Sequence, residues 1–155
     1  MTSVAILTDN GIGKDEVDVK KHLIEEFREN DIDVIDASSF DSLQECKCVI
    51  LLFYNTYSKV TTGFEEIARK LVELNIKPIV LIINAQNADV DYVKVGESLA
   101  KVWGDINPTL YCNDIISYFY NNDSKTAYQV NTGEEYGVSE LIYTIKMLRG
   151  KMKFF

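Results

Sequence analysis

The chain has 155 residues and a net charge of −8, and its 46% hydrophobic and 26% charged residues are typical of a globular domain rather than a disordered chain. The acidic balance disfavours a binder of nucleic acid or anionic membranes, because neutralising phosphates needs clustered Lys and Arg. No apolar run reaches the ~18 residues of a membrane-spanning helix, and three cysteines with one histidine match neither a zinc site nor a disulfide framework. We therefore expect one intracellular domain over residues 1–155, cytoplasmic or, as the alternative, nuclear.

Strand and helix patterns alternate along the chain. Short apolar runs rich in β-branched residues predict strands, and apolar residues three and four apart predict helices. The predicted strands cover residues 3–8, 31–37, 48–55, 77–84 and 108–113. The predicted helices cover residues 15–29, 64–71, 91–103 and 136–149. This alternation predicts a three-layer α/β fold, in which helices cover both faces of a mostly parallel sheet.

An aromatic insert at residues 114–135 precedes the last predicted helix. Its centre, "YFYNNDSKTAYQV", is consistent with a hairpin around "NNDS" or with a mobile loop. Since Tyr and Phe are enriched in interface cores, we expect part of this insert to bind another protein, with a hairpin packed in its own domain as the alternative. The candidate partner-binding residues are Tyr118, Phe119, Tyr120 and Tyr128. For the final "RGKMKFF" we expect a frayed terminus.

The stretch "LTDNGIGKDEV" follows the first predicted strand and opens the first predicted helix. Gly11 and Gly13 allow a tight turn, and Lys14 has the charge to neutralise a phosphate at the start of the helix. The phosphate-loop pattern G-x-x-x-x-G-K-[ST] is incomplete, because Thr8 replaces its first glycine and Asp15 its final hydroxyl residue. An ordinary strand-to-helix turn with Asp15 near the N-cap explains the same letters.

Over nearly its full length the chain resembles the Ras-like small GTPases. "VAILTDNGIGKDEV" is similar to their phosphate loop, "IDASSFDSLQECKCVILLFY" to the D-x-x-G segment and its neighbouring strand, and "KPIVLIIN" to the strand that leads to N-K-x-D. The resemblance implies a small-GTPase-like, P-loop type fold without a full switch region. The nucleotide-binding positions that it implies, as a vestigial site, are Gly11, Gly13, Lys14, Asp15, Asp36, Asn84 and Asn87.

Several residues of this family's nucleotide site are replaced. Asp15 stands where a hydroxyl residue holds magnesium, and Ser39 replaces the glycine of D-x-x-G. Asn87 replaces the aspartate that accepts two hydrogen bonds from guanine, and an amide oxygen cannot reproduce both of them. Only 21 residues separate Lys14 from Asp36, too few for a helix, a switch loop and an extra edge strand.

The resemblance with these departures implies a pseudo-GTPase, similar to the α- and γ-adaptin-binding protein or to centromere protein M. The implied function is a catalytically inactive scaffold or assembly chaperone that binds other proteins, in clathrin-adaptor assembly or at the kinetochore. We expect no enzymatic activity and no metal site. We also expect no cofactor beyond weak GTP or GDP with magnesium, no nucleic-acid partner, no membrane anchor and no other small-molecule ligand.

Two alternatives remain open. One is an atypical GTP-binding small GTPase that uses Gly11, Gly13, Lys14 and Asp36. The other is a flavodoxin-like FMN protein, because "TDNGIGK" is similar to a hydroxyl- and glycine-rich phosphate loop and the short spacing to residues 31–37 suits that fold. The aromatics that would stack on flavin from nearby loops are Tyr54, Tyr57 and Tyr92. A phospho-receiver is disfavoured, because Asn55 ends the central strand where that class needs an aspartate.

Overall fold

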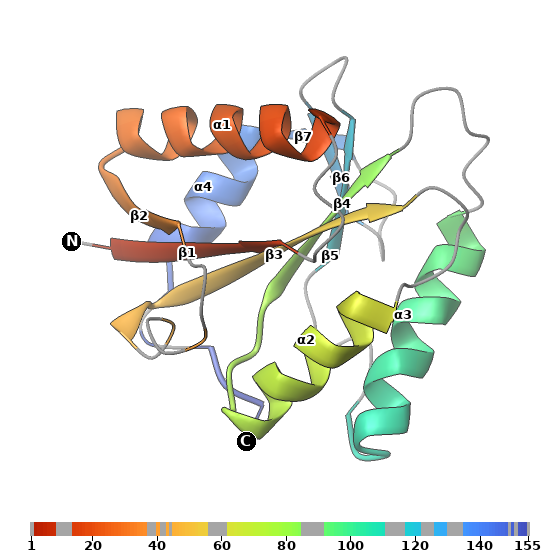
Figure 1. The fold of residues 1–155 in the computed structure, drawn as a ribbon. Coiled ribbons are helices and arrows are strands. Elements are labelled where there is room, and N and C mark those ends of the chain that lie inside the picture. The colour runs from red at the N-terminus through yellow and green to blue at the C-terminus, as the bar shows by residue number, and fades with distance from the viewer. Residues whose placement is uncertain are drawn as a thin grey trace.

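The computed structural model describes most of the chain as alternating strands and helices (Figure 1). The described residues are 2–8, 14–36, 40, 43, 45–55, 62–84, 92–110, 117–121, 126–129, 135–148, 150 and 152–154. In chain order the elements are β1 (Thr2–Thr8), α1 (Lys14–Glu29), β2 (Ile32–Asp36), β3 (Cys48–Asn55), α2 (Thr62–Glu73), β4 (Ile79–Asn84), α3 (Tyr92–Ile106), β5 (Ser117–Asn121), β6 (Thr126–Gln129), β7 (Glu135–Gly137) and α4 (Val138–Lys146).

The strands of the described residues form one sheet in the order β2-β1-β3-β4-β5-β6-β7. The first five strands of that order run parallel, and β6 and β7 continue the sheet in antiparallel fashion. The chain leaves β1 through α1 toward β2 on one side, and β3 then pairs with the other side of β1. This arrangement confirms the predicted α/β fold with a mostly parallel sheet.

Helices cover both faces of the sheet, so the core has two halves (Figure 1). Alternate residues of a strand point to opposite faces. In β1, Val4 and Ile6 pack with α1 and α4, whereas Ala5 and Leu7 pack with α2 and α3. β3 divides its side chains in the same way. The central strands are therefore buried on both faces, which explains why their sequences are nearly continuous apolar runs.

The strand predicted at residues 108–113 does not form over its described part, residues 108–110. After α3 the Asn107 side chain accepts hydrogen bonds from the backbone amide of Thr109 at 3.0 Å and from its hydroxyl at 2.8 Å. The amide of Leu110 also donates to the carbonyl of Asn107, at 2.9 Å. These bonds close a turn, because an Asn side chain can imitate a backbone turn. The fifth parallel strand lies further on, at β5, and residues 111–116 are outside the described residues.

The hairpin predicted around "NNDS" is confirmed. β5 and β6 pair antiparallel, with Asn121 opposite Thr126. A further short strand, β7, was not predicted and pairs with β6 directly before α4. The predicted insert thus supplies the fifth parallel strand, β5, and extends the sheet beyond it in antiparallel fashion.

The C-terminal tail is packed, so the expectation of a frayed end is wrong for its described residues, 152–154. The amide of Lys77 donates to the carbonyl of Met152 at 3.0 Å, and the amide of Phe154 donates to Oδ1 of Asn75 at 2.9 Å. The Phe154 ring also lies against Trp103 on α3, with 5.8 Å between ring centroids. Within the part of the chain that the structure describes, no helix has the length and apolarity that a membrane crossing requires.

α1 and α2 are each followed, two residues beyond their last residue, by a residue in the left-handed region: Asp31 with φ 61° and Asn75 with φ 55°. Asn75 completes a Schellman motif, since Ile76 donates to the carbonyl of Leu71 at 2.9 Å and Asn75 to that of Val72 at 3.0 Å. Asp31 lies two residues beyond the end of α1, and its amide donates to the carbonyl of Arg28 at 3.2 Å. Glycine is the residue that adopts this conformation without steric cost.

We expect Asp31→Gly to raise the free energy of unfolding by about 0.5–1 kcal/mol, because it relieves the left-handed backbone and removes a negative charge from a helix C-terminus. Urea denaturation measures the change. Asp33→Gly is the matched control: Asp33 is also exposed but lies within β2, so its replacement should lower stability. Equal effects of the two substitutions would contradict the left-handed strain at Asp31.

Candidate functional site

The carboxyl edge of the parallel sheet contains a topological switch point between β1 and β3. The chain leaves β1 toward β2 on one side, and the strands from β3 onward extend to the other. Open α/β sheets bind ligands in the crevice at such a point, because the connections on either side diverge there. The strand ends that frame it are Thr8 of β1 and Asn55 of β3.

The N-terminus of α1 lies directly beyond this point, since α1 begins at Lys14 and β1 ends at Thr8. The five connecting residues, 9–13, are outside the described residues. A helix of 16 residues leaves its first backbone N–H groups without partners in the helix and carries a partial positive charge at that end. Together these features attract an anion, above all a phosphate.

The structure places only part of the predicted nucleotide site. Lys14 and Asp15 are the first residues of α1, and Asp36 and Asn84 are the last residues of β2 and β4. These backbone positions share the carboxyl edge, as the pattern predicted for parallel strands. Their side chains are not described, and Gly11, Gly13 and Asn87 lie outside the described residues.

The candidate partner-binding aromatic residues of the insert lie on two strands of the sheet. Tyr118 and Phe119 belong to β5 and Tyr128 to β6, and their side chains are not described. Tyr120 is completely buried against the α1 and α4 side of the sheet, so this residue is wrong as a surface candidate for partner binding. Among the aromatics considered for flavin stacking, Tyr54 lies within β3 rather than on a loop, Tyr92 begins α3, and Tyr57 is outside the described residues.

Tyr120 also has an unusual electrostatic environment. Its hydroxyl has no hydrogen-bond partner among the described residues. Burial, and secondarily the carboxylate of Glu26 on α1, raise the pKa of Tyr120 to about 12. The hydroxyl therefore stays protonated at neutral pH and is a poor general base.

Among the described residues there is no group of three His, Cys, Asp or Glu residues that could hold a metal ion. The single histidine, His22, lies on α1 with its Nε2 3.9 Å from Oε1 of Glu26. Asn55 ends β3, and an amide there cannot accept a phosphoryl group as an aspartate would.

Comparison with solved structures identifies the fold. A cysteine-to-serine mutant of flavodoxin from Pseudomonas aeruginosa matches with a TM-score of 0.55 and 13% identity, covering 96% of this chain and 100% of that chain. A cysteine-to-alanine mutant of the same flavodoxin matches with a TM-score of 0.48, 14% identity and coverage of 68% and 76%. The receiver domain of the Francisella response regulator 1452 matches with a TM-score of 0.44, 15% identity and coverage of 96% of both chains. No protein-family model and no curated protein matches the chain.

The chain has a flavodoxin-like fold. This assignment depends on the match to the cysteine-to-serine flavodoxin mutant and on the parallel strand order 2-1-3-4-5, which is the order of that fold. At 13% identity the match defines the fold alone.

The predicted resemblance to Ras-like GTPases is therefore wrong, together with the P-loop fold and the pseudo-GTPase scaffold or chaperone derived from it. The short interval between Lys14 and Asp36 explains the error. α1 occupies residues 14–29 and is followed at once by β2, which pairs parallel with β1. That interval therefore holds one complete helix-and-strand unit of a flavodoxin-like fold, rather than a GTPase switch region with parts missing.

Proposed function

We propose that this chain is a flavodoxin-like domain that binds FMN at the β1/β3 switch point. The observation that carries the proposal is that α1 begins shortly beyond β1 at that point, after five connecting residues. Flavodoxin, whose parallel sheet has this strand order, binds FMN at the same place, and a helix N-terminus there suits its phosphate. The proposal replaces the expectation of a scaffold without a small-molecule ligand.

The residues present fit the phosphate of such a ligand. Thr8 is the last residue of β1 and is half-buried, so its hydroxyl can contribute a hydrogen bond beside the first N–H groups of α1. Lys14 supplies a positive charge at the first position of the helix. When bound, FMN would supply one- or two-electron transfer at its isoalloxazine ring, and the protein would supply binding and orientation.

Titration of flavin-free protein with FMN tests the proposal, with flavin fluorescence as the readout. We expect saturable binding of one FMN per chain at micromolar concentration or below. Riboflavin should bind at least tenfold more weakly, since it lacks the phosphate and each charge-assisted hydrogen bond contributes about 1.5–3 kcal/mol. No saturation with FMN would overturn the proposal. Equal affinity for riboflavin would show that the start of α1 does not bind the phosphate.

Thr8→Val should weaken FMN binding about tenfold, because it removes the hydroxyl and preserves the shape of the side chain. Thr144→Val is the matched control, since the Thr144 hydroxyl donates to the carbonyl of Glu140 within α4 at 2.9 Å and is part of a different element. Unchanged affinity in the Thr8 variant would show that this hydroxyl does not contact the ligand.

A further inference from the structure

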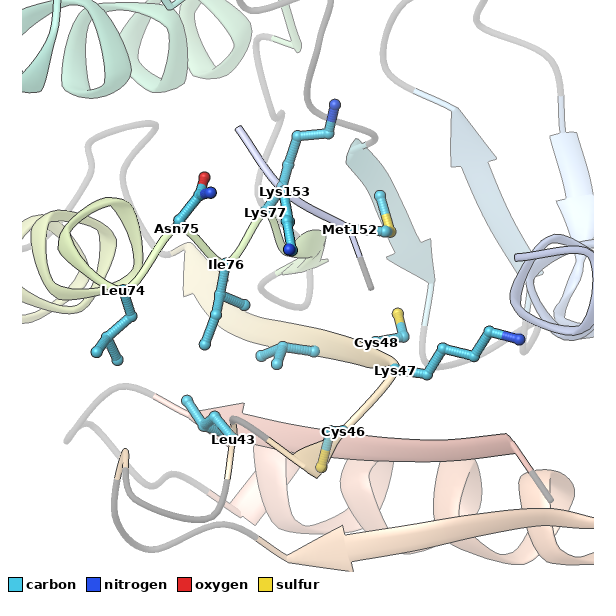
Figure 2. A pocket seen from close by; sticks show the side chains of 11 residues that line it. Leu43, Cys46, Lys47, Cys48, Leu74, Asn75, Ile76, Lys77, Met152 and Lys153 are labelled. Atoms are coloured by element: carbon cyan, nitrogen blue, oxygen red, sulfur yellow. The ribbon is translucent and has the colours of Figure 1, made fainter. Parts of the chain in front are cut away.

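A second candidate site is a cavity at the opposite, amino edge of the sheet, with a volume of about 220 Å³. Figure 2 shows that its lining comes from three segments: residues 43 and 46–49 before and at the start of β3, residues 74–77 before β4, and the C-terminal tail at 152–153. It is smaller than the ~300–1,000 Å³ pockets that hold drug-sized ligands. A ligand of this cavity is therefore a small molecule.

The charge of the lining is opposite to that of the chain. Acidic residues outnumber basic ones 24 to 16 in the whole sequence, yet the eleven lining residues include three lysines and no carboxylate. These are Lys47, Lys77 and Lys153, one from each segment. None of the three forms an ion pair with another described residue. An anion entering the cavity would therefore meet positive charge without competition from a carboxylate of the lining.

The rest of the lining is mostly apolar. Leu43 and Val49 are buried core residues, and Ile76 and Met152 pack against the two halves of the core. Cys48 also lines the cavity, but burial, and secondarily Cys46, raise the pKa of its thiol to about 12. A thiol with such a pKa is not a nucleophile at neutral pH. The lining therefore supports binding rather than covalent chemistry.

The docked tail holds one wall of the cavity in place. Lys153 lies between two anchored residues, because the carbonyl of Met152 accepts from the Lys77 amide and the amide of Phe154 donates to Asn75. The Schellman motif at the end of α2 fixes Asn75 in turn. Such preorganisation reduces the entropy that binding must overcome.

We propose that this amino-edge pocket binds a small organic anion. The carboxylate or phosphate of the ligand is attracted by the positive charge of Lys47, Lys77 and Lys153, whose ammonium groups extend in different directions in Figure 2, and its short apolar body lies against Ile76 and Met152. The proposal stands independently of FMN binding, since the β1/β3 switch point lies at the other end of the strands.

Titration of the full ¹⁵N-labelled chain with hexanoate, hexyl phosphate and hexan-1-ol tests this, followed by amide chemical shifts. We expect saturable shifts at Lys47, Asn75 and Lys77 with at least one of the two anions, and at least tenfold weaker binding of the uncharged alcohol. Saturation by hexyl phosphate alone would assign a phosphate monoester, and saturation by hexanoate alone a carboxylate. Shifts that stay linear with every probe would overturn the proposal.

A double variant, Lys77→Gln with Lys153→Gln, should lose at least tenfold in affinity for the binding anion. The control is Lys21→Gln with Lys101→Gln, which changes the net charge equally at two exposed lysines outside the pocket and should keep the affinity. Equal losses of affinity in both double variants would mean that the anion responds only to the net charge of the chain, and this would overturn the proposed binding site. If the pocket variant does not fold, the salt dependence of binding to the unaltered chain decides: an affinity unchanged by added salt also overturns it.

Discussion

Replacing Trp103 with alanine should lower the free energy of unfolding by about 3–5 kcal/mol, the usual cost of removing a large aromatic side chain from a core. Trp103 is buried on the α2 and α3 side of the sheet. Its ring meets Phe64 edge-on, with centroids 6.2 Å apart and an interplanar angle of 72°, and also contacts Phe154 of the tail. The substitution therefore opens a cavity and removes two aromatic contacts together.

Urea denaturation followed by circular dichroism measures this effect, because Trp103 is the only tryptophan and its own fluorescence is lost in the variant. The control is Tyr143→Ala on α4, where the side chain is 59% exposed and the change should stay within about 0.5 kcal/mol. The Trp103 variant should also exchange the Phe154 amide faster, since the tail loses its aromatic contact. A loss of stability no larger than that of the control would contradict the packing described here.

Replacing Tyr120 with phenylalanine should raise the free energy of unfolding, by about 1–3 kcal/mol. The Tyr120 side chain is fully buried, and its hydroxyl has no hydrogen-bond partner among the described residues. Such a group loses its hydration on folding without compensation, which costs about 1–3 kcal/mol. Phenylalanine keeps the ring and removes the cost. Tyr143→Phe is the control, since an exposed hydroxyl has no such penalty and its removal should leave stability unchanged.

The gain in stability from Tyr120→Phe should depend on pH in the alkaline range. The pKa of Tyr120 rises from 10.0 to about 12 in the folded chain, so the unfolded chain loses this proton first as the pH increases. Stability is therefore intact below pH 10 and falls as the pH rises through the interval from 10.0 to about 12. The phenylalanine variant lacks this titration, so its advantage should be constant below that interval and increase within it. A destabilised variant would instead reveal a hydrogen-bond partner of the hydroxyl.

Most of the fold could be predicted because the sequence signal is local. β1, β3 and β4 are apolar runs buried on both faces, and α2 presents Phe64, Ala68 and Leu71 at helical spacing. The fifth parallel strand could not be located in this way. "PTLYCN" has the apolar pattern of a strand, but the Asn107 side chain and Pro108 turn the chain there, and β5 is recognised only through its pairing with β4.

The candidate sites could be predicted only in part. The glycine-rich stretch after β1 predicted an anion site at the start of α1, and the structure confirms the strand before it and the helix after it. The same residues also suggested a different family, because several kinds of phosphate loop have a lysine after a glycine. Strand order distinguishes the folds, but it depends on pairing between distant parts of the chain and cannot be read from one stretch of sequence. The lysines of the amino-edge pocket are 30 and 76 residues apart in the sequence, so no local motif connects them. Only the positions of Lys47 and Lys77 just before two parallel strands hinted that both lie at one edge.

The strands β6 and β7 affect how readily separate molecules aggregate through the edges of their sheets. Without them, β5 would end the parallel sheet with an unpaired row of backbone donors and acceptors, the template on which strands of another chain aggregate. β7 replaces that edge with a strand of three residues, and β2 at the far edge places the exposed carboxylate of Asp33 beside its own unpaired side. A strand of three residues at one edge and an exposed carboxylate at the other both disfavour pairing with a second copy of the chain.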